Sequence, residues 1–206
     1  LGEGQFSPLL LMFGQCLYDM KASIFLALTG HYRAAIQQLR PVLENVITGL
    51  WFNTRLQAET EEERQRAMHE FEQWTEDRFE LPPFANMVEQ LAEHFLLLDN
   101  KASEQWRELI QLMHPFYPEL TKGRVKRVWH RLSKFLHPYY QMTDIRREFE
   151  TESHTICPAR VVWDKNAYHD WLILFQNIAD IMLRIIVGMC PNVVETEDGK
   201  EGLGFI

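Results

Sequence analysis

Apolar residues recur along this chain at the three- and four-residue spacing of an amphipathic helix, and no segment shows the regular alternation typical of a strand. The spacing predicts long helices over residues 8–28, 31–51, 61–79, 121–136 and 165–189. Shorter helices are expected after Pro83 and over residues 102–113. The chain is therefore predicted to be all-α.

Residues at the expected helix boundaries support these ranges. Gly30 follows the first helix and is a typical C-terminal residue, while Asp164 precedes the last helix as an N-cap. Thr60 and Glu63 form a capping box at the start of the third helix. About six helices with short connections predict one domain over residues 1–206, an up-and-down helical bundle with flexible ends at 1–7 and 192–206.

Composition narrows the class of protein. The 206 residues are 46% hydrophobic, as in a globular domain, and the net charge of -8 excludes a protein that binds nucleic acid over its whole surface. Three cysteines without CxxC spacing favour a reducing, cytoplasmic location. The most apolar segment, residues 172–189, carries its polar residues on one face, so we expect a soluble helix and no membrane span.

One segment, KGRVKRVWHRLSKFLHPYY at residues 122–140, departs from this acidic background. It contains no acidic residue, and its apolar positions keep helical spacing, so it predicts an amphipathic helix with a cationic outer face. We expect phosphate contacts from the basic residues Lys122, Arg124, Lys126, Arg127 and Lys134, joined by Arg40. Arg40 has an alternative role as the ion-pair partner of Glu44, four residues later.

Arg131 and His137 are the candidate catalytic residues. Pro138 places His137 at the end of the basic helix, where its ring can turn toward Arg131. Such a pair suits phosphodiester cleavage without metal, because the His moves protons and the Arg stabilises charge on the phosphoryl oxygens. The alternative is a surface Arg and a His bonded to a backbone carbonyl. No metal or cofactor motif occurs, and His130 lies about 10 Å from His137 along a helix, too far to share a metal.

Two segments resemble the HEPN superfamily of helical domains. YRAAIQQLRPVLE at residues 32–44 is similar to the pattern YRxAxxxLRxxLE, and LSKFLHP at residues 132–138 is similar to LSxxxHP. The resemblance implies a helical bundle that often dimerises, in many members as a metal-independent RNase or a toxin partner, with Arg131 and His137 as the hallmark pair. Leu132 stands where RNase members favour Asn, Asp or His, which leaves catalysis open.

Two hypotheses follow. The first is a HEPN-like domain, expected to form a homodimer, that binds RNA and cleaves it through Arg131 and His137 if the pair is active. The second is a non-catalytic helical interaction or dimerisation module, in which the basic helix meets an acidic protein partner of unknown identity.

Overall fold

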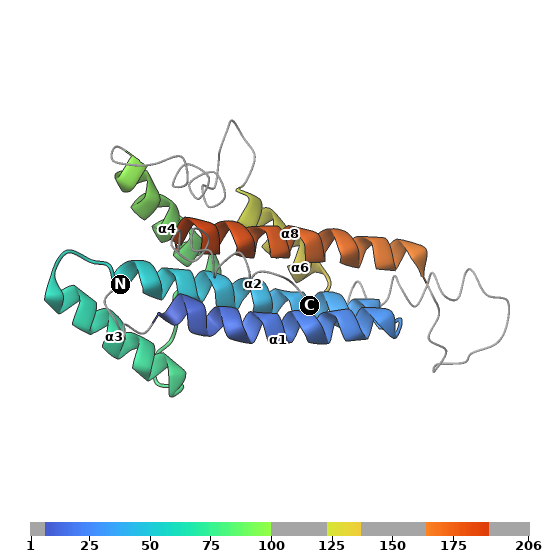
Figure 1. Cartoon of the computed structure of the whole chain (residues 1–206), viewed down its shortest axis with the longest axis horizontal. Coiled ribbons are helices and arrows are strands. Elements are labelled where there is room, and N and C mark those ends of the chain that lie inside the picture. Colours follow the sequence, from blue (N-terminus) through green and yellow to red (C-terminus); the bar gives the residue numbers. More distant parts are fainter. Residues whose placement is uncertain (1–6, 100–122, 137–163, 190–206) are drawn as a thin grey trace, which may run out of the picture.

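The computed structural model describes residues 7–99, 123–136 and 164–189, and these ranges contain six helices and no strand (Figure 1). The prediction of an all-α fold is confirmed. The helices are α1 (Pro8–Leu28), α2 (Tyr32–Arg55), α3 (Glu61–Thr75), α4 (Phe84–Asp99), α6 (Arg124–Lys134) and α8 (Lys165–Met189). The helix expected over 102–113 and the ends expected to be flexible, apart from residue 7, lie outside the described residues.

α2 is the central helix of the bundle. It packs against each of the other five described helices, and Figure 1 shows it running between α1 and α8. Residues 46–54 of α2 are all buried, whereas a helix that is covered on one face keeps exposed residues on the other. The apolar core is therefore assembled around α2.

The chain reverses direction sharply between α1 and α2. Gly30 adopts a left-handed φ of 78°, its N–H donates to the Ala27 carbonyl at 3.0 Å, and the His31 N–H donates to the Leu26 carbonyl at 2.8 Å. This pattern is the Schellman motif, which favours glycine because the left-handed conformation strains other residues. The predicted end of the first helix is confirmed, and the reversal lays α1 antiparallel to α2.

Local capping sets the ends of the other predicted helices. The Thr60 hydroxyl accepts from the Glu63 N–H at 3.3 Å, and the Asp164 carboxylate accepts from the N–H groups of Asn166 and Ala167. Both predicted starts are confirmed. The third helix was predicted to reach residue 79 but ends at Thr75, because Asp77 takes a left-handed φ of 56° and reverses the chain.

A buried hydroxyl connects three helices. Ser23 of α1 donates to the Ala35 carbonyl of α2 at 2.8 Å and accepts from Trp171 Nε1 of α8 at 2.9 Å. Ser23 is fully buried and Trp171 is 5% exposed, so water does not compete for these bonds. The hydroxyl therefore links α1, α2 and α8 at one buried point.

We expect Gly49→Ala to lower the free energy of unfolding by about 1–3 kcal/mol, because a Cβ there overpacks the α1–α2 contact. That atom would lie 2.9 Å from Met12 Cβ and 3.1 Å from Leu9 Cα. Urea denaturation followed by circular dichroism measures the change. Gly14→Ala in α1 is the control, since its Cβ meets no atom within 4 Å. Equal destabilisation by the two substitutions would contradict the close approach.

Candidate nucleic-acid interface

The basic segment forms α6, and its apolar residues attach it to the bundle. Val125, Val128 and Leu132 are buried at spacings of three and four residues, as predicted for an amphipathic helix. The observed helix covers residues 124–134, shorter at both ends than the predicted 121–136. Its remaining positions carry the positive charges.

Trp129 joins α6 to both α2 and α4. Its ring stacks on Phe84 with centroids 5.1 Å apart, and its Nε1 donates to Glu44 Oε1 at 2.9 Å. Arg40 lies over the same ring at 5.3 Å and pairs with Glu44 at 2.7 Å. The predicted Arg40–Glu44 pair is thus present. Arg40 also faces the basic helix, where it packs against an aromatic ring.

Two side chains of α2 close the C-terminal end of α6. Arg33 Nη2 and Gln37 Nε2 each donate to the Phe135 carbonyl at 3.2 Å. The last carbonyls of a helix have no partner within the helix, so these bonds satisfy a group that would otherwise need water. His137 follows two residues later and, like Lys122, lies outside the described residues.

Two cations of α6 are held by carboxylates of the bundle. Arg124 pairs with Asp180 of α8 and also donates to Asn177 Oδ1 at 3.0 Å, while Lys126 Nζ lies 2.6 Å from Glu89 of α4. Partial burial acts to raise the pKa of Asp180, but hydrogen bonds and positive charge from Arg184 and Arg124 outweigh it and lower that pKa. Arg124 and Lys126 therefore attach α6 to its neighbours.

The other basic residues point outward. The exposed residues Arg127, His130, Arg131 and Lys134 follow the spacing i, i+3, i+4, i+7 and form what we call the outer row of α6. Arg131 contacts Asp170 at 2.7 Å, with both side chains nearly half exposed. Within the described part of the chain, Arg127 and Lys134 form no ion pair.

A small apolar cavity adjoins the outer row, and the sequence did not indicate it. Its volume is about 150 Å³, and it is lined by Phe84, Ala85, Lys126, Trp129 and His130. Pockets that enclose a whole ligand usually measure about 300–1,000 Å³, so this one suits a single ring of a longer ligand. The cavity forms where α4 meets α6. Its aromatic residues Phe84 and Trp129 are 45 positions apart in the chain, so only the packing of the two helices brings them together.

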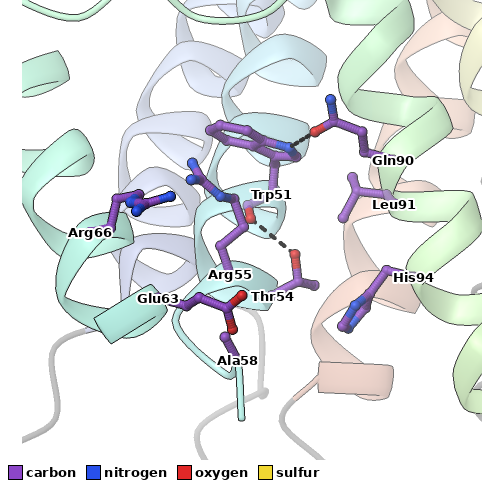
Figure 2. A pocket seen from close by; sticks show the side chains of 9 residues that line it. All are labelled: Trp51, Thr54, Arg55, Ala58, Glu63, Arg66, Gln90, Leu91 and His94. Atoms are coloured by element: carbon purple, nitrogen blue, oxygen red, sulfur yellow. Dashed lines mark hydrogen bonds between the residues drawn. The ribbon is translucent and has the colours of Figure 1, made fainter. Parts of the chain in front are cut away.

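A larger cavity of about 370 Å³ lies between α2, α3 and α4 (Figure 2). It is lined by Trp51, Thr54, Arg55, Ala58, Glu63, Arg66, Gln90, Leu91 and His94. Trp51 Nε1 donates to Gln90 at 2.7 Å, and Arg55 stacks 4.4 Å over the Trp51 ring while pairing with Glu70. Burial lowers the pKa of His94, which favours its neutral form. Trp51, Gln90, Thr54 and Arg55 are therefore already held by hydrogen bonds or an ion pair.

The chain matches no protein-family model. A search of the curated proteins and a search of the solved structures likewise find no match. In the described ranges, no group of three His, Cys, Asp or Glu side chains is placed to hold a metal ion.

We expect Asp180→Asn to lower the free energy of unfolding at pH 7 by about 1 kcal/mol or less, because water screens a side chain that is 39% exposed. The folded-state pKa of Asp180 is lowered, so its contribution is present above its usual pKa of about 4 and is lost as the pH falls below that value. Urea denaturation of the wild type and the variant across pH 3–7 measures the difference. A difference that persists unchanged at pH 3 would contradict this assignment.

Proposed function

We propose that the outer row of α6 binds single-stranded RNA. The observation that carries this proposal is the alignment of Arg127, His130, Arg131 and Lys134 on one exposed face. Seven residues of helix span about 10 Å, which lets these side chains contact successive phosphates of one strand. Arg124, Lys126 and Arg40 contribute indirectly, because they hold α6 in place.

The aromatic cavity beside the outer row supports a single strand as the ligand. Proteins that bind single strands combine a cationic surface for the backbone with aromatic rings that stack on bases. His130 belongs to both features, since it stands in the outer row and lines the cavity with Trp129. A base that leaves the strand at His130 would enter the cavity, whereas a base-paired duplex would keep its bases away from it.

The expected binding is weak and depends strongly on salt. Three permanent cations in the outer row give a slope of log K against log salt concentration of roughly -2 for a single strand, at about 0.7 per phosphate. The net charge of -8 opposes the approach of a polyanion. The outer row must therefore attract the RNA at short range, against the repulsion from the net negative charge of the chain.

The HEPN-like proposal adds cleavage by Arg131 and His137. In this scheme His137 moves protons, and Arg131 stabilises the charge that develops on the phosphoryl oxygens. Arg131 is already paired with Asp170 at 2.7 Å, so a phosphate has to displace this carboxylate before Arg131 can act. The pair is exposed, and its disruption costs about 1 kcal/mol or less.

A second candidate function is a non-catalytic interaction module. It is favoured by the carboxylates Glu89, Asp170 and Asp180, each of which binds a cation of α6 within the chain itself. An acidic protein segment would offer the same groups to Arg127 and Lys134. The RNA experiment below also distinguishes this candidate, because a module of this kind needs no affinity for RNA.

We expect Arg127→Ala/Lys134→Ala to weaken RNA binding roughly tenfold at about 50 mM salt and to reduce the salt slope by about 1 or more. Fluorescence anisotropy with a labelled single-stranded RNA measures both quantities. Arg124→Ala/Arg184→Ala is the matched control, since it removes the same charge from two residues that are both bound to Asp180 and lie outside the outer row and the cavity. It should lower stability and leave affinity nearly unchanged.

Equal loss of affinity in the two double variants would show that only total charge matters, and the outer row would not be a site. A wild-type protein that fails to bind RNA at low salt would remove the nucleic-acid function and leave the interaction module.

For cleavage, we expect the wild type to cut single-stranded RNA in EDTA and both His137→Ala and Arg131→Ala to lose this activity. Asp170→Asn should raise the rate about two- to fivefold, because it releases Arg131 from an exposed ion pair. Gel analysis of labelled RNA over time measures these rates. An inactive wild type would end the catalytic proposal while leaving RNA binding intact.

A further inference from the structure

α1 presents an apolar surface to the outside of the bundle. Ten large hydrophobic residues are exposed in the described ranges, and seven of them belong to α1. Six form adjacent pairs, Leu10 with Leu11, Leu17 with Tyr18 and Ile24 with Phe25, and Leu28 follows. Their exposure runs from 36% to 73%, and a large exposed apolar surface of this kind is typical of an interaction site.

The pairs repeat every seven residues, which is the spacing of a helix that packs along another helix. Gly14, Lys21 and Leu28 share a further position of the same repeat. We call these positions together the outer stripe of α1. The opposite face is already used, since Leu9, Met12 and Cys16 are buried in the core. Among the described helices, α1 packs mainly against α2 and also contacts α8, and its outer stripe has no described occupant.

We propose that the outer stripe packs against the outer stripe of a second copy of this chain, with the two α1 helices antiparallel. A two-fold axis between Leu17 and Tyr18 would place Leu10 opposite Phe25 of the second copy and Leu11 opposite its Ile24. A closed two-fold dimer buries the same surface on both chains, so this self-complementarity suits a second copy.

The two exceptions in the apolar pattern support this register. Gly14 is the one position of the stripe without a side chain, and Lys21 is the one charged position. In the antiparallel register they face each other across the interface. No atom lies within 4 Å of a Cβ placed on Gly14, so the aliphatic stem of Lys21 can cover this gap while its ammonium group reaches water.

A membrane is the other occupant that such a surface suggests. By length and composition alone, α1 and α8 are each apolar enough to cross a membrane, and only 28% of each apolar window is buried. Insertion of α1 would have to break the buried Ser23–Trp171 bond and uncover the core around α2. Lying on a membrane surface is disfavoured too, because anionic lipids repel a chain of charge -8 and Lys21 is the only cation on the stripe.

The dimer is independent of the proposed RNA site. In Figure 1 α1 lies on the side of α2 opposite to α8, whereas α6 packs against α8, α2 and α4. The outer row of α6 stays accessible when two α1 helices pair. Loss of dimerisation and loss of RNA binding are consequently separate results, obtained with different variants.

Light scattering after size-exclusion chromatography tests the proposal on the full chain at micromolar concentration. The wild type should have twice the 24.5 kDa mass of one chain, and Leu17→Glu/Tyr18→Glu should have the single mass. Leu183→Glu/Val187→Glu on α8 is the matched control, because it adds the same charge at residues that are 44% and 40% exposed. Circular dichroism confirms that each variant keeps its helices.

Cysteine cross-linking tests the register. In a background with Cys157→Ser and Cys190→Ser, oxidation of a mixture of Gly14→Cys and Lys21→Cys chains should give a mixed disulfide, and neither variant alone should link to itself. Cys16 does not interfere, because burial raises its pKa to about 12 and keeps it protonated.

Three results would overturn the proposal: a monomeric wild type, a dimer that persists in Leu17→Glu/Tyr18→Glu, or self-linking of Gly14→Cys as a parallel pair requires. Sedimentation with vesicles of zwitterionic lipid adds one further check. A monomer that sediments with vesicles through the outer stripe would assign this surface to a membrane.

Discussion

The arrangement of this bundle depends on the hydroxyl of Ser23. It is bonded to the Ala35 carbonyl and to Trp171 Nε1, and it is the only group that joins α1, α2 and α8 through hydrogen bonds in the described structure. Leaving a buried polar group without a partner costs about 1–3 kcal/mol, so rotating α1 away from this bond is unfavourable. α1 is apolar on two faces, and this hydroxyl, together with the bonds of Cys16 and Asp19 to α2, holds one of them in the core. The other face, the outer stripe, is exposed.

The same constraint determines which charges of α6 are free. Trp171 links α8 to the same buried point. Because α6 runs antiparallel to α8, Asp170 then lies next to Arg131, and Asp180 lies next to Arg124. Arg124 is held by an amide and a carboxylate and becomes part of the packing. Arg127 and Lys134 lie beside Arg131 in the outer row, form no ion pair within the described part of the chain, and keep their charge available for a ligand.

Capping residues made several helix ends predictable, because a cap acts within a few residues of itself. Gly30, Thr60 and Asp164 all mark the ends that their chemistry predicts. The end of α3 was not predicted, since Asp77 takes a left-handed conformation that asparagine and glycine adopt more readily. The candidate site was predictable only as a basic amphipathic segment. The cavity beside His130 required knowledge that α4 packs against α6.

The sequence by itself determined the all-α class, the position of most helices and the concentration of positive charge in residues 122–134, because periodicity, capping and composition are local properties. Only the tertiary structure decided which of these positive charges are bound by carboxylates and which face solvent. Arg124 and Lys126 are neutralised by residues 56 and 37 positions away, whereas the outer row faces solvent. It also decided that seven large apolar residues of α1 are exposed. Helical spacing marks both faces of α1 as apolar, and only the packing of α2 and α8 selects one of them.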